Sequence, residues 1–342
     1  TLPDFRSMSM PYWFELPEGQ GYSNQPQHTH GGYQYFLQYT DKDGGYAATE
    51  NYQNTILSSG PVYTDVKMDY ISDDGRIKVS YNHMEFPQTD ENRAYYEMKY
   101  EVVGDVSFSN FVKDFHFYRV GPNDSNGHYR RIGYINTDNK YAVAEAKLDG
   151  TSQKIVLGTE SPYFSFYDMP DWDRESTSVE GYTNLSFIIY NYEFIIGGEA
   201  VEPNFCIVNQ DNKVYLTLDL GEVELKAGDT FTINAIVMPW GSQELESKYD
   251  SDGKLLDDPE NGIYFYDSIV NEATGEKYED KNVRNVRENS LLNPLRAIAV
   301  DNCAVMESVF LPKIKTNDGK SATFTLTGGY NNCAVRIYGF DM

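Results

Sequence analysis

Apolar and polar residues alternate along much of the chain with the period of two that is typical of β-strands. Residues 214–220 alternate in this way, and residues 230–237 do so again after the turn-forming residues 226–229. We expect these two runs to form an antiparallel hairpin with one face in the core. Similar alternation runs through residues 77–81 and 96–102, which adds further strands to the same class of fold.

The spacing of these runs predicts an all-β fold, in the form of a large antiparallel β-sandwich. Short stretches rich in aromatic and β-branched residues are separated by Gly, Asn and Asp about every ten residues, a spacing that is typical of sandwiches and barrels. The sequence Ser-Asp-Asp-Gly at residues 72–75 favours a hairpin turn. Helical periodicity is confined to residues 282–292, where we expect one short helix.

The domain organisation has two interpretations. The stretch 197–203, with two Gly and one Pro, separates two strand-rich regions. It could divide the chain into an N-terminal sandwich lobe, residues 1–198, and a C-terminal sandwich lobe, residues 199–342. It could equally be an internal loop of one continuous large sandwich, because 342 residues suit either arrangement.

The net charge limits the classes of partner. The chain carries 52 Asp and Glu against 28 Lys and Arg, a net charge of -24. Such a surface repels nucleic acid, anionic lipid and polyanionic glycans, and it favours neutral glycans and cations. The most apolar run, residues 187–196, is interrupted by polar residues, so we expect no membrane insertion.

Cysteine usage and the first residue say little about compartment. The three cysteines, Cys206, Cys303 and Cys333, allow one disulfide with one free thiol, and Cys303 and Cys333 would pair if their strands were neighbours. The chain begins with Thr1 instead of Met, which indicates a processed or excised piece, with further domains of a larger chain as potential partners.

One candidate catalytic group lies between residues 82 and 96. His83 or Tyr95 as base, with Arg93 as the charge-stabilising cation, is the set that a polysaccharide lyase uses to remove a proton beside a uronate. The alternative interpretation is a set of cross-strand pairs on a solvated face.

A second group would suit glycoside hydrolysis. Asp171, Asp173 and Glu175 alternate with other residues, so they would supply an acid and a base if the segment is a strand. The flanking Pro170 favours an ordinary loop instead. Exposed aromatic residues would stack on sugar rings, and the tryptophans are the candidates: Trp13, Trp172 and Trp240.

Two loops carry candidate metal or sugar ligands. Asp250, Asp252 and Asp257 present hard oxygens around a Gly-containing turn, which suits a structural Ca²⁺, although the spacing is not that of an EF-hand. His28 and His30 point the same way on an extended segment and would bind a metal ion or sugar hydroxyls. No cofactor is required by any of these interpretations, and the sequence contains no phosphate-binding Gly loop or zinc-spaced Cys pair.

A resemblance to a known family rests on residues 60–66, 75–79 and 93–100, which look like the long twisted hairpins of the galactose-mutarotase-like supersandwich. The resemblance covers residues 60–120 and includes no diagnostic motif. It implies a module of the kind found in secreted polysaccharide lyases and glycoside hydrolases, either accessory or self-sufficient.

Together these observations predict a secreted, carbohydrate-active protein, at the cell surface or outside the cell. It would cleave a polysaccharide or bind it as an accessory module. The alternative is an extracellular structural or adhesive protein without catalysis, whose aromatic residues lie in the core and whose acidic loops face solvent or Ca²⁺.

Overall fold

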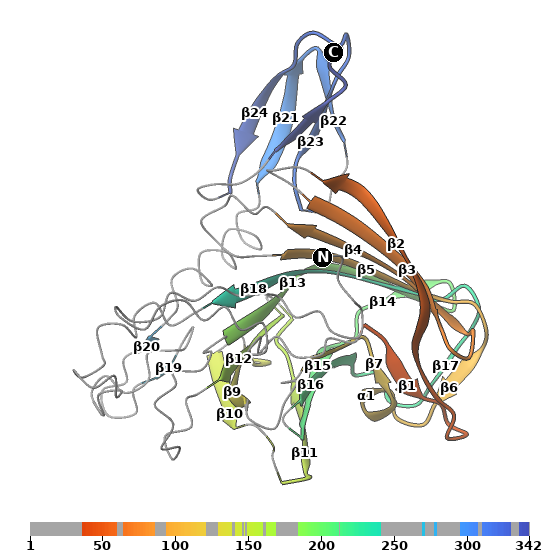
Figure 1. Ribbon diagram of the computed structural model, residues 1–342. Helices are drawn as coiled ribbons and strands as arrows, with labels where there is room; N and C mark the ends of the chain where they lie inside the picture. Colours follow the sequence, from red (N-terminus) through yellow and green to blue (C-terminus); the bar gives the residue numbers. More distant parts are fainter. Residues whose placement is uncertain are drawn as a thin grey trace, which may run out of the picture.

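The fold is almost entirely β, which confirms the predicted all-β sandwich (Figure 1). The computed structural model describes residues 36–59, 64–85, 94–120, 129–138, 141–145, 147, 149–159, 162–168, 184–211, 213–240, 269–270, 277–278, 295–306, 310–329 and 335–341. Within these ranges there are 25 strands and one short helix, α1 (Phe111–Asp114). The helix that the sequence predicted at residues 282–292 lies outside the described residues.

One large antiparallel sheet forms the upper layer of the sandwich. Its strands follow the spatial order β10-β9-β12-β13-β18-β5-β4-β3-β2-β1-β7, with β14 paired to β13. Their bounds are β1 (Gln38–Thr40), β2 (Tyr46–Ser59), β3 (Thr64–Ser72), β4 (Ile77–Glu85), β5 (Ala94–Val102), β7 (Phe115–His116), β9 (Tyr129–Ile135), β10 (Tyr141–Glu145), β12 (Tyr163–Asp168), β13 (Asn184–Ile196), β14 (Glu199–Val201) and β18 (Thr230–Trp240).

A smaller sheet forms the lower layer. It has the order β11-β15-β16-β8, with β8 (Tyr118–Val120), β11 (Ser152–Val156), β15 (Phe205–Gln210) and β16 (Lys213–Leu218). Two further pairs are β6 (Val106–Phe108) with β17 (Val223–Leu225), and β19 (Ile269–Val270) with β20 (Lys277–Tyr278). Among the described residues, no helix is long and apolar enough to cross a membrane.

Aromatic rings fill the space between the two layers. Phe36, Tyr81, Tyr118 and Phe187 are fully buried, with ring centroids 4.2 Å apart for Phe36 and Tyr81 and 4.8 Å apart for Tyr118 and Phe187. Such ring contacts add to the free energy gained from burying apolar area, by roughly 0.5–1.5 kcal/mol a pair. Most of the aromatic content therefore serves the core.

The segment 115–120 joins the two layers. Phe115 and His116 add β7 to the edge of the large sheet, and Tyr118–Val120 then add β8 to the edge of the small sheet. Between them, the Phe117 amide donates a hydrogen bond to the Leu216 carbonyl, at 2.9 Å. The sandwich is closed along this side by a continuous piece of chain.

The predicted hairpin between residues 214–220 and 230–237 is wrong, although both strands exist. β16 pairs with β15 and β8 in the small sheet, whereas β18 pairs with β13 and β5 in the large sheet. Both strands point an apolar face into the same core, from opposite layers. The period of two identifies the buried face of a strand but not its partner.

The turn predicted at residues 72–75 is confirmed between β3 and β4. Gly75 has a φ of 74°, a conformation that favours Gly. The Ser72 hydroxyl accepts hydrogen bonds from the amides of Arg76 and Ile77, at 3.2 and 3.0 Å. Arg76 also bridges two carboxylates, Asp41 and Asp74, so two neighbouring turns are held together.

The expected boundary near residue 198 falls at a tight turn between β13 and β14. Strands from both sides of this turn lie in the same large sheet, since β5 pairs with β18. A separate unit comes later in the chain. We call residues 295–341 the terminal unit.

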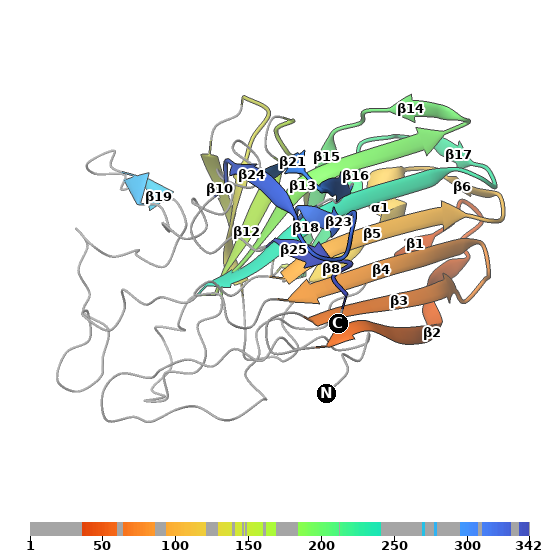
Figure 2. The same cartoon turned by 90° about the horizontal axis from the view of Figure 1, so that it is seen from above.

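The terminal unit consists of two small sheets, β21–β24 and β22-β23-β25. Its strands are β21 (Arg296–Asp301), β22 (Cys303–Met306), β23 (Lys313–Thr316), β24 (Thr323–Thr327) and β25 (Arg336–Tyr338). It stands on the outer face of the large sheet (Figures 1 and 2). Phe310 anchors it there, with ring centroids 5.1 Å from Tyr95 and 5.3 Å from Tyr190.

Candidate functional site

The two described members of the predicted lyase group lie on opposite faces of the large sheet. His83, on β4, is 6% exposed and faces the core, where its Nδ1 lies 3.1 Å from the Tyr81 hydroxyl. Tyr95, on β5, is 5% exposed and faces outward against Phe310. Directly opposite His83 stands Tyr96, so successive residues of β5 alternate between the faces. The two side chains therefore do not belong to one site.

The other predicted site residues lie outside the described residues: Trp13, His28, His30, Arg93, Asp171, Trp172, Asp173, Glu175, Asp250, Asp252 and Asp257. Trp240 ends β18, but its side chain is also outside the description. The described part of the chain contains no group of three His, Cys, Asp or Glu side chains placed to hold a metal ion. Cys303 carries a free thiol, whose Sγ lies 3.1 Å from the Thr323 carbonyl oxygen.

A cluster that the sequence did not reveal lies on the outside of the sandwich, where the two layers meet. It is made of one residue from each of five strands, β1, β2, β7, β8 and β16. We call these residues the platform cluster: Gln38, Tyr46, His116, Arg119 and Tyr215. Their neighbours in sequence, such as Tyr39, Phe115 and Leu216, face the core, and the alternation of the strands turns the cluster outward.

Tyr215 is the centre of the platform cluster. Its ring centroid lies 4.5 Å from that of His116, and the Arg119 guanidinium carbon lies 5.9 Å from the same centroid. Gln38 reaches His116 from the side, with 3.3 Å between the amide nitrogen and Nδ1. Tyr46 is 62% exposed, which makes it the most exposed aromatic side chain among the described residues. The cluster therefore combines open aromatic surface with planar hydrogen-bonding groups.

The cluster keeps its imidazole neutral. Burial lowers the pKa of His116 to about 4, and the positive charge of Arg119 acts in the same direction. A backbone hydrogen bond with Val112 opposes this shift of the pKa but does not offset it. Burial also raises the pKa of Tyr215, and nearby Tyr46 contributes in the same direction. At neutral pH the cluster holds two phenols, a neutral imidazole, an amide and one guanidinium.

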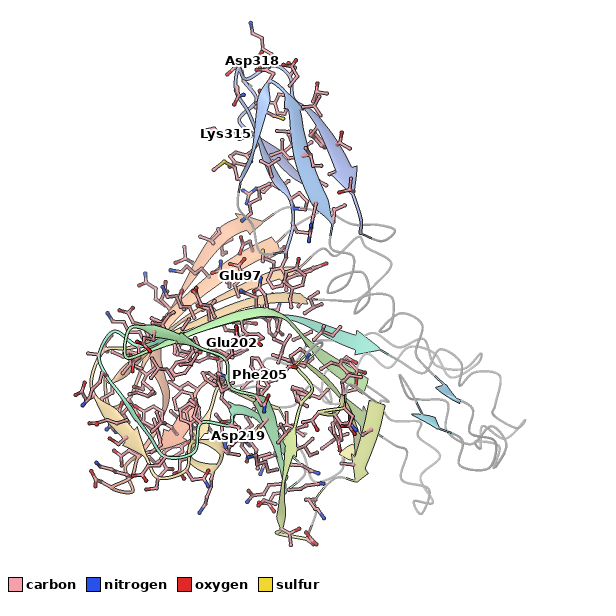
Figure 3. All side chains as sticks on the ribbon, turned by 180° about the vertical axis from the view of Figure 1, so that it is seen from behind. Glu97, Glu202, Phe205, Asp219, Lys315 and Asp318 are labelled. Atoms are coloured by element: carbon pink, nitrogen blue, oxygen red, sulfur yellow. The ribbon has the colours of Figure 1, made fainter. Side chains whose placement is uncertain are left out.

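A second polar cluster lies on the outer face of the large sheet, beneath the terminal unit. Glu97 is mostly buried there, and the Asn82 amide lies 3.5 Å from its Oε2. Burial raises the pKa of Glu97; Lys313 of the terminal unit opposes this shift, and Asp65 reinforces it. Figure 3 shows Glu97 on the side of the sheet that faces the terminal unit. These groups belong to the contact between the unit and the sheet.

No family model matches the sequence, and no curated protein matches it. Solved structures with some similarity include α-galactosidases. The galactosidase domain of the α-galactosidase–sucrose kinase AgaSK has a TM-score of 0.37 and 10% identity, over 60% of this chain and 29% of its own. The GH36 α-galactosidase AgaA from Geobacillus stearothermophilus has a TM-score of 0.35 and 9% identity, over 60% of this chain and 30% of its own. The α-galactosidase from Lactobacillus brevis has a TM-score of 0.35 and 14% identity, over 68% of this chain and 31% of its own. The chain thus covers less than a third of each of these proteins, and similarity at this level assigns neither family nor function.

Proposed function

We propose that the chain is a glycan-binding β-sandwich module, which holds a neutral polysaccharide on the platform cluster. The observation that carries this proposal is the grouping of Tyr46, Tyr215, His116 and Arg119 on one outward surface. Ligand sites commonly combine aromatic surface with a few fixed polar groups that set orientation. The apolar face of a sugar ring would lie against the tyrosines, and its hydroxyls would bind the polar groups.

The choice of a neutral glycan follows from charge. The chain as a whole carries a net charge of -24, which opposes the approach of a polyanion. His116 adds no positive charge at neutral pH, so the Arg119 guanidinium is the one charged group of the cluster. The proposal also places the protein outside the cell, where polysaccharide is accessible.

Binding is favoured over cleavage because both side chains predicted as alternative bases of the lyase set are buried. His83 is enclosed in the core, and Tyr95 is covered on the opposite face. A base must reach the proton that it removes, and burial of His83 and Tyr95 keeps both side chains from such contact.

Affinity electrophoresis tests the proposal. The purified chain is run in native gels that contain galactomannan, xyloglucan or soluble starch, beside the variants Tyr46→Ala and Tyr215→Ala. We expect retardation by at least one of these glycans, and roughly tenfold weaker binding in each variant, as for a central aromatic contact. Phe340→Ala is the matched control, because Phe340 is 45% exposed on the terminal unit, away from the cluster.

Equal retardation of wild type and both tyrosine variants would refute the role of the platform cluster. The absence of retardation by any glycan would favour the structural or adhesive alternative. New reducing ends after incubation would instead identify a hydrolase, and absorbance from unsaturated uronates after incubation with pectin or alginate would identify a lyase.

A further inference from the structure

Exposed apolar side chains are concentrated on the terminal unit. Among the described residues, seven of the ten exposed large apolar side chains lie there: Ile298, Val300, Val305, Met306, Leu326, Ile337 and Phe340. The much larger sandwich supplies the other three. Single exposed apolar residues are ordinary, so what matters is whether neighbours are exposed together. Ile298 and Val300 lie close together on β21, whereas Leu326 pairs with Ala297 on the opposite face of the same sheet.

The β21–β24 sheet has one face that is exposed throughout. Paired residues lie on the same face of a sheet, and β21 pairs with β24 through Ile298↔Thr325 and Asp301↔Thr323, with a bulge at Val300. We call these exposed residues the outer terminal face: Arg296, Ile298, Val300, Asp301, Thr323, Thr325 and Thr327. Figure 1 shows β21 and β24 side by side, standing away from the large sheet. A two-stranded sheet is marginal by itself and gains stability when a face is covered.

The outer terminal face carries a positive charge at one end and a negative charge at the other, so two copies of the face can pair with opposite charges in contact. Arg296 lies at one end of β21, near Tyr190 of the large sheet. Asp301 lies at the other end, beside Asn302, which bonds to Ser321 at the tip of the unit. A second copy turned by two-fold rotation about an axis perpendicular to the strands would place each Arg296 against the Asp301 of its partner.

Net charge also singles out the terminal unit. Residues 295–341 contain five Lys and Arg against four Asp and Glu, in a chain with a net charge of -24. Two copies repel each other through their sandwiches but not through these units. In the antiparallel arrangement the sandwiches lie at opposite ends of β21, which is about 20 Å long at ~3.3 Å a residue. The separation exceeds the electrostatic screening length of about 8 Å at physiological salt, so repulsion between the two sandwiches is largely screened.

We propose that the outer terminal face binds a second copy of this chain, as an antiparallel two-fold dimer. Ile298 and Val300 would be covered by their counterparts and by the threonines of β24. Two Arg296–Asp301 pairs would close the two ends of the interface. An interface that is related by two-fold symmetry uses the same patch on both copies, which is the commonest arrangement of homodimers.

Charge exchange provides the test, by sedimentation equilibrium of the full chain over a range of concentrations. Either Arg296→Asp or Asp301→Arg turns both attractive pairs into like-charge pairs, and we expect the dimer dissociation constant to rise roughly tenfold or more. The double variant Arg296→Asp with Asp301→Arg restores both pairs with exchanged positions and should recover the wild-type constant. Ile298→Asp should abolish the dimer.

Lys315→Asp is the matched control, since it makes the same change in charge at an exposed position on β23. It should leave the dimer unchanged. Circular dichroism and thermal unfolding confirm that each variant folds. A wild-type chain that is monomeric at all concentrations overturns the proposal. So does a double variant that dimerises no better than either single variant.

Discussion

Asp229 joins two turns that lie far apart in the sequence, and its removal should destabilise the sandwich measurably. It is 3% exposed, at the start of β18. One carboxylate oxygen accepts a hydrogen bond from the Gly197 amide at 2.7 Å, and the other accepts from the Lys226 amide at 2.8 Å. The β13–β14 turn is thereby fixed to the turn before β18.

The expected cost follows from these two contacts. In Asp229→Ala both amides lose a charged acceptor, and a hydrogen bond to a charged group contributes about 1.5–3 kcal/mol. Gly197 is exposed, so water can bind its amide in the variant, and the loss of this hydrogen bond costs less free energy than the loss of a buried one. We therefore expect a loss of about 2–4 kcal/mol in the free energy of unfolding. Asp229→Asn keeps one acceptor oxygen and should lose roughly half as much.

Equilibrium urea unfolding, followed by tyrosine fluorescence and circular dichroism, measures both losses. Asp43→Ala is the control, because Asp43 is an exposed carboxylate in another turn. We expect a change of less than about 0.5 kcal/mol for this variant. If Asp229→Ala is as stable as Asp43→Ala, the carboxylate does not hold the two turns together and the reasoning fails.

Two further predictions concern titration. The pKa of His116 is about 4 in the folded chain and 6.5 by reference, so the unfolded chain binds more protons between these values. Stability should therefore fall as the pH is lowered from 6.5 toward 4, by up to about 3 kcal/mol. His116→Gln should reduce this slope in urea unfolding at a series of pH values, and an unchanged slope would contradict the assignment. Because burial raises the pKa of Glu97, Glu97→Gln should raise the melting temperature at neutral pH and not below pH ~4, where the carboxyl is protonated. The exposed control Glu101→Gln, on the same face of β5, should show no such difference; a matching gain there would point to net charge instead.

The class of fold could be predicted from the sequence because alternation marks strands that bury one face. The alternation of residues 77–81 and 96–102 corresponds to β4 and β5, and the turn at 72–75 lies between β3 and β4. The partners of a strand are set by the whole sheet, and this is why the expected pairing of β16 with β18 was wrong. Local pattern does not record which of two layers a strand joins.

Burial limited the prediction of sites in a similar way. In the sequence, His83 is a residue type suited to catalysis. In the structure, its side chain is buried in the core and packs against the ring of Tyr96. The tryptophans were the candidates for sugar contacts, and most of the Tyr and Phe side chains that the structure describes are buried in the core. Tyr46, the most exposed aromatic residue that the structure describes, follows the Gly-containing turn at residues 41–45, and nothing in its sequence neighbourhood predicts this exposure.

The platform cluster depends on a shift in alternation that no pattern of period two would predict. Phe115 faces the core and His116 faces outward, but Phe117 and Tyr118 are both fully buried before Arg119 faces outward again. The shift occurs where the chain passes from the large sheet to the small sheet, between β7 and β8. Strict alternation would have placed Arg119 on the same face as Phe117, inside the core. Because the phase changes at the crossing, the two polar side chains converge on Tyr215 from different layers. The closure of the sandwich and the formation of its candidate binding surface thus have the same structural cause.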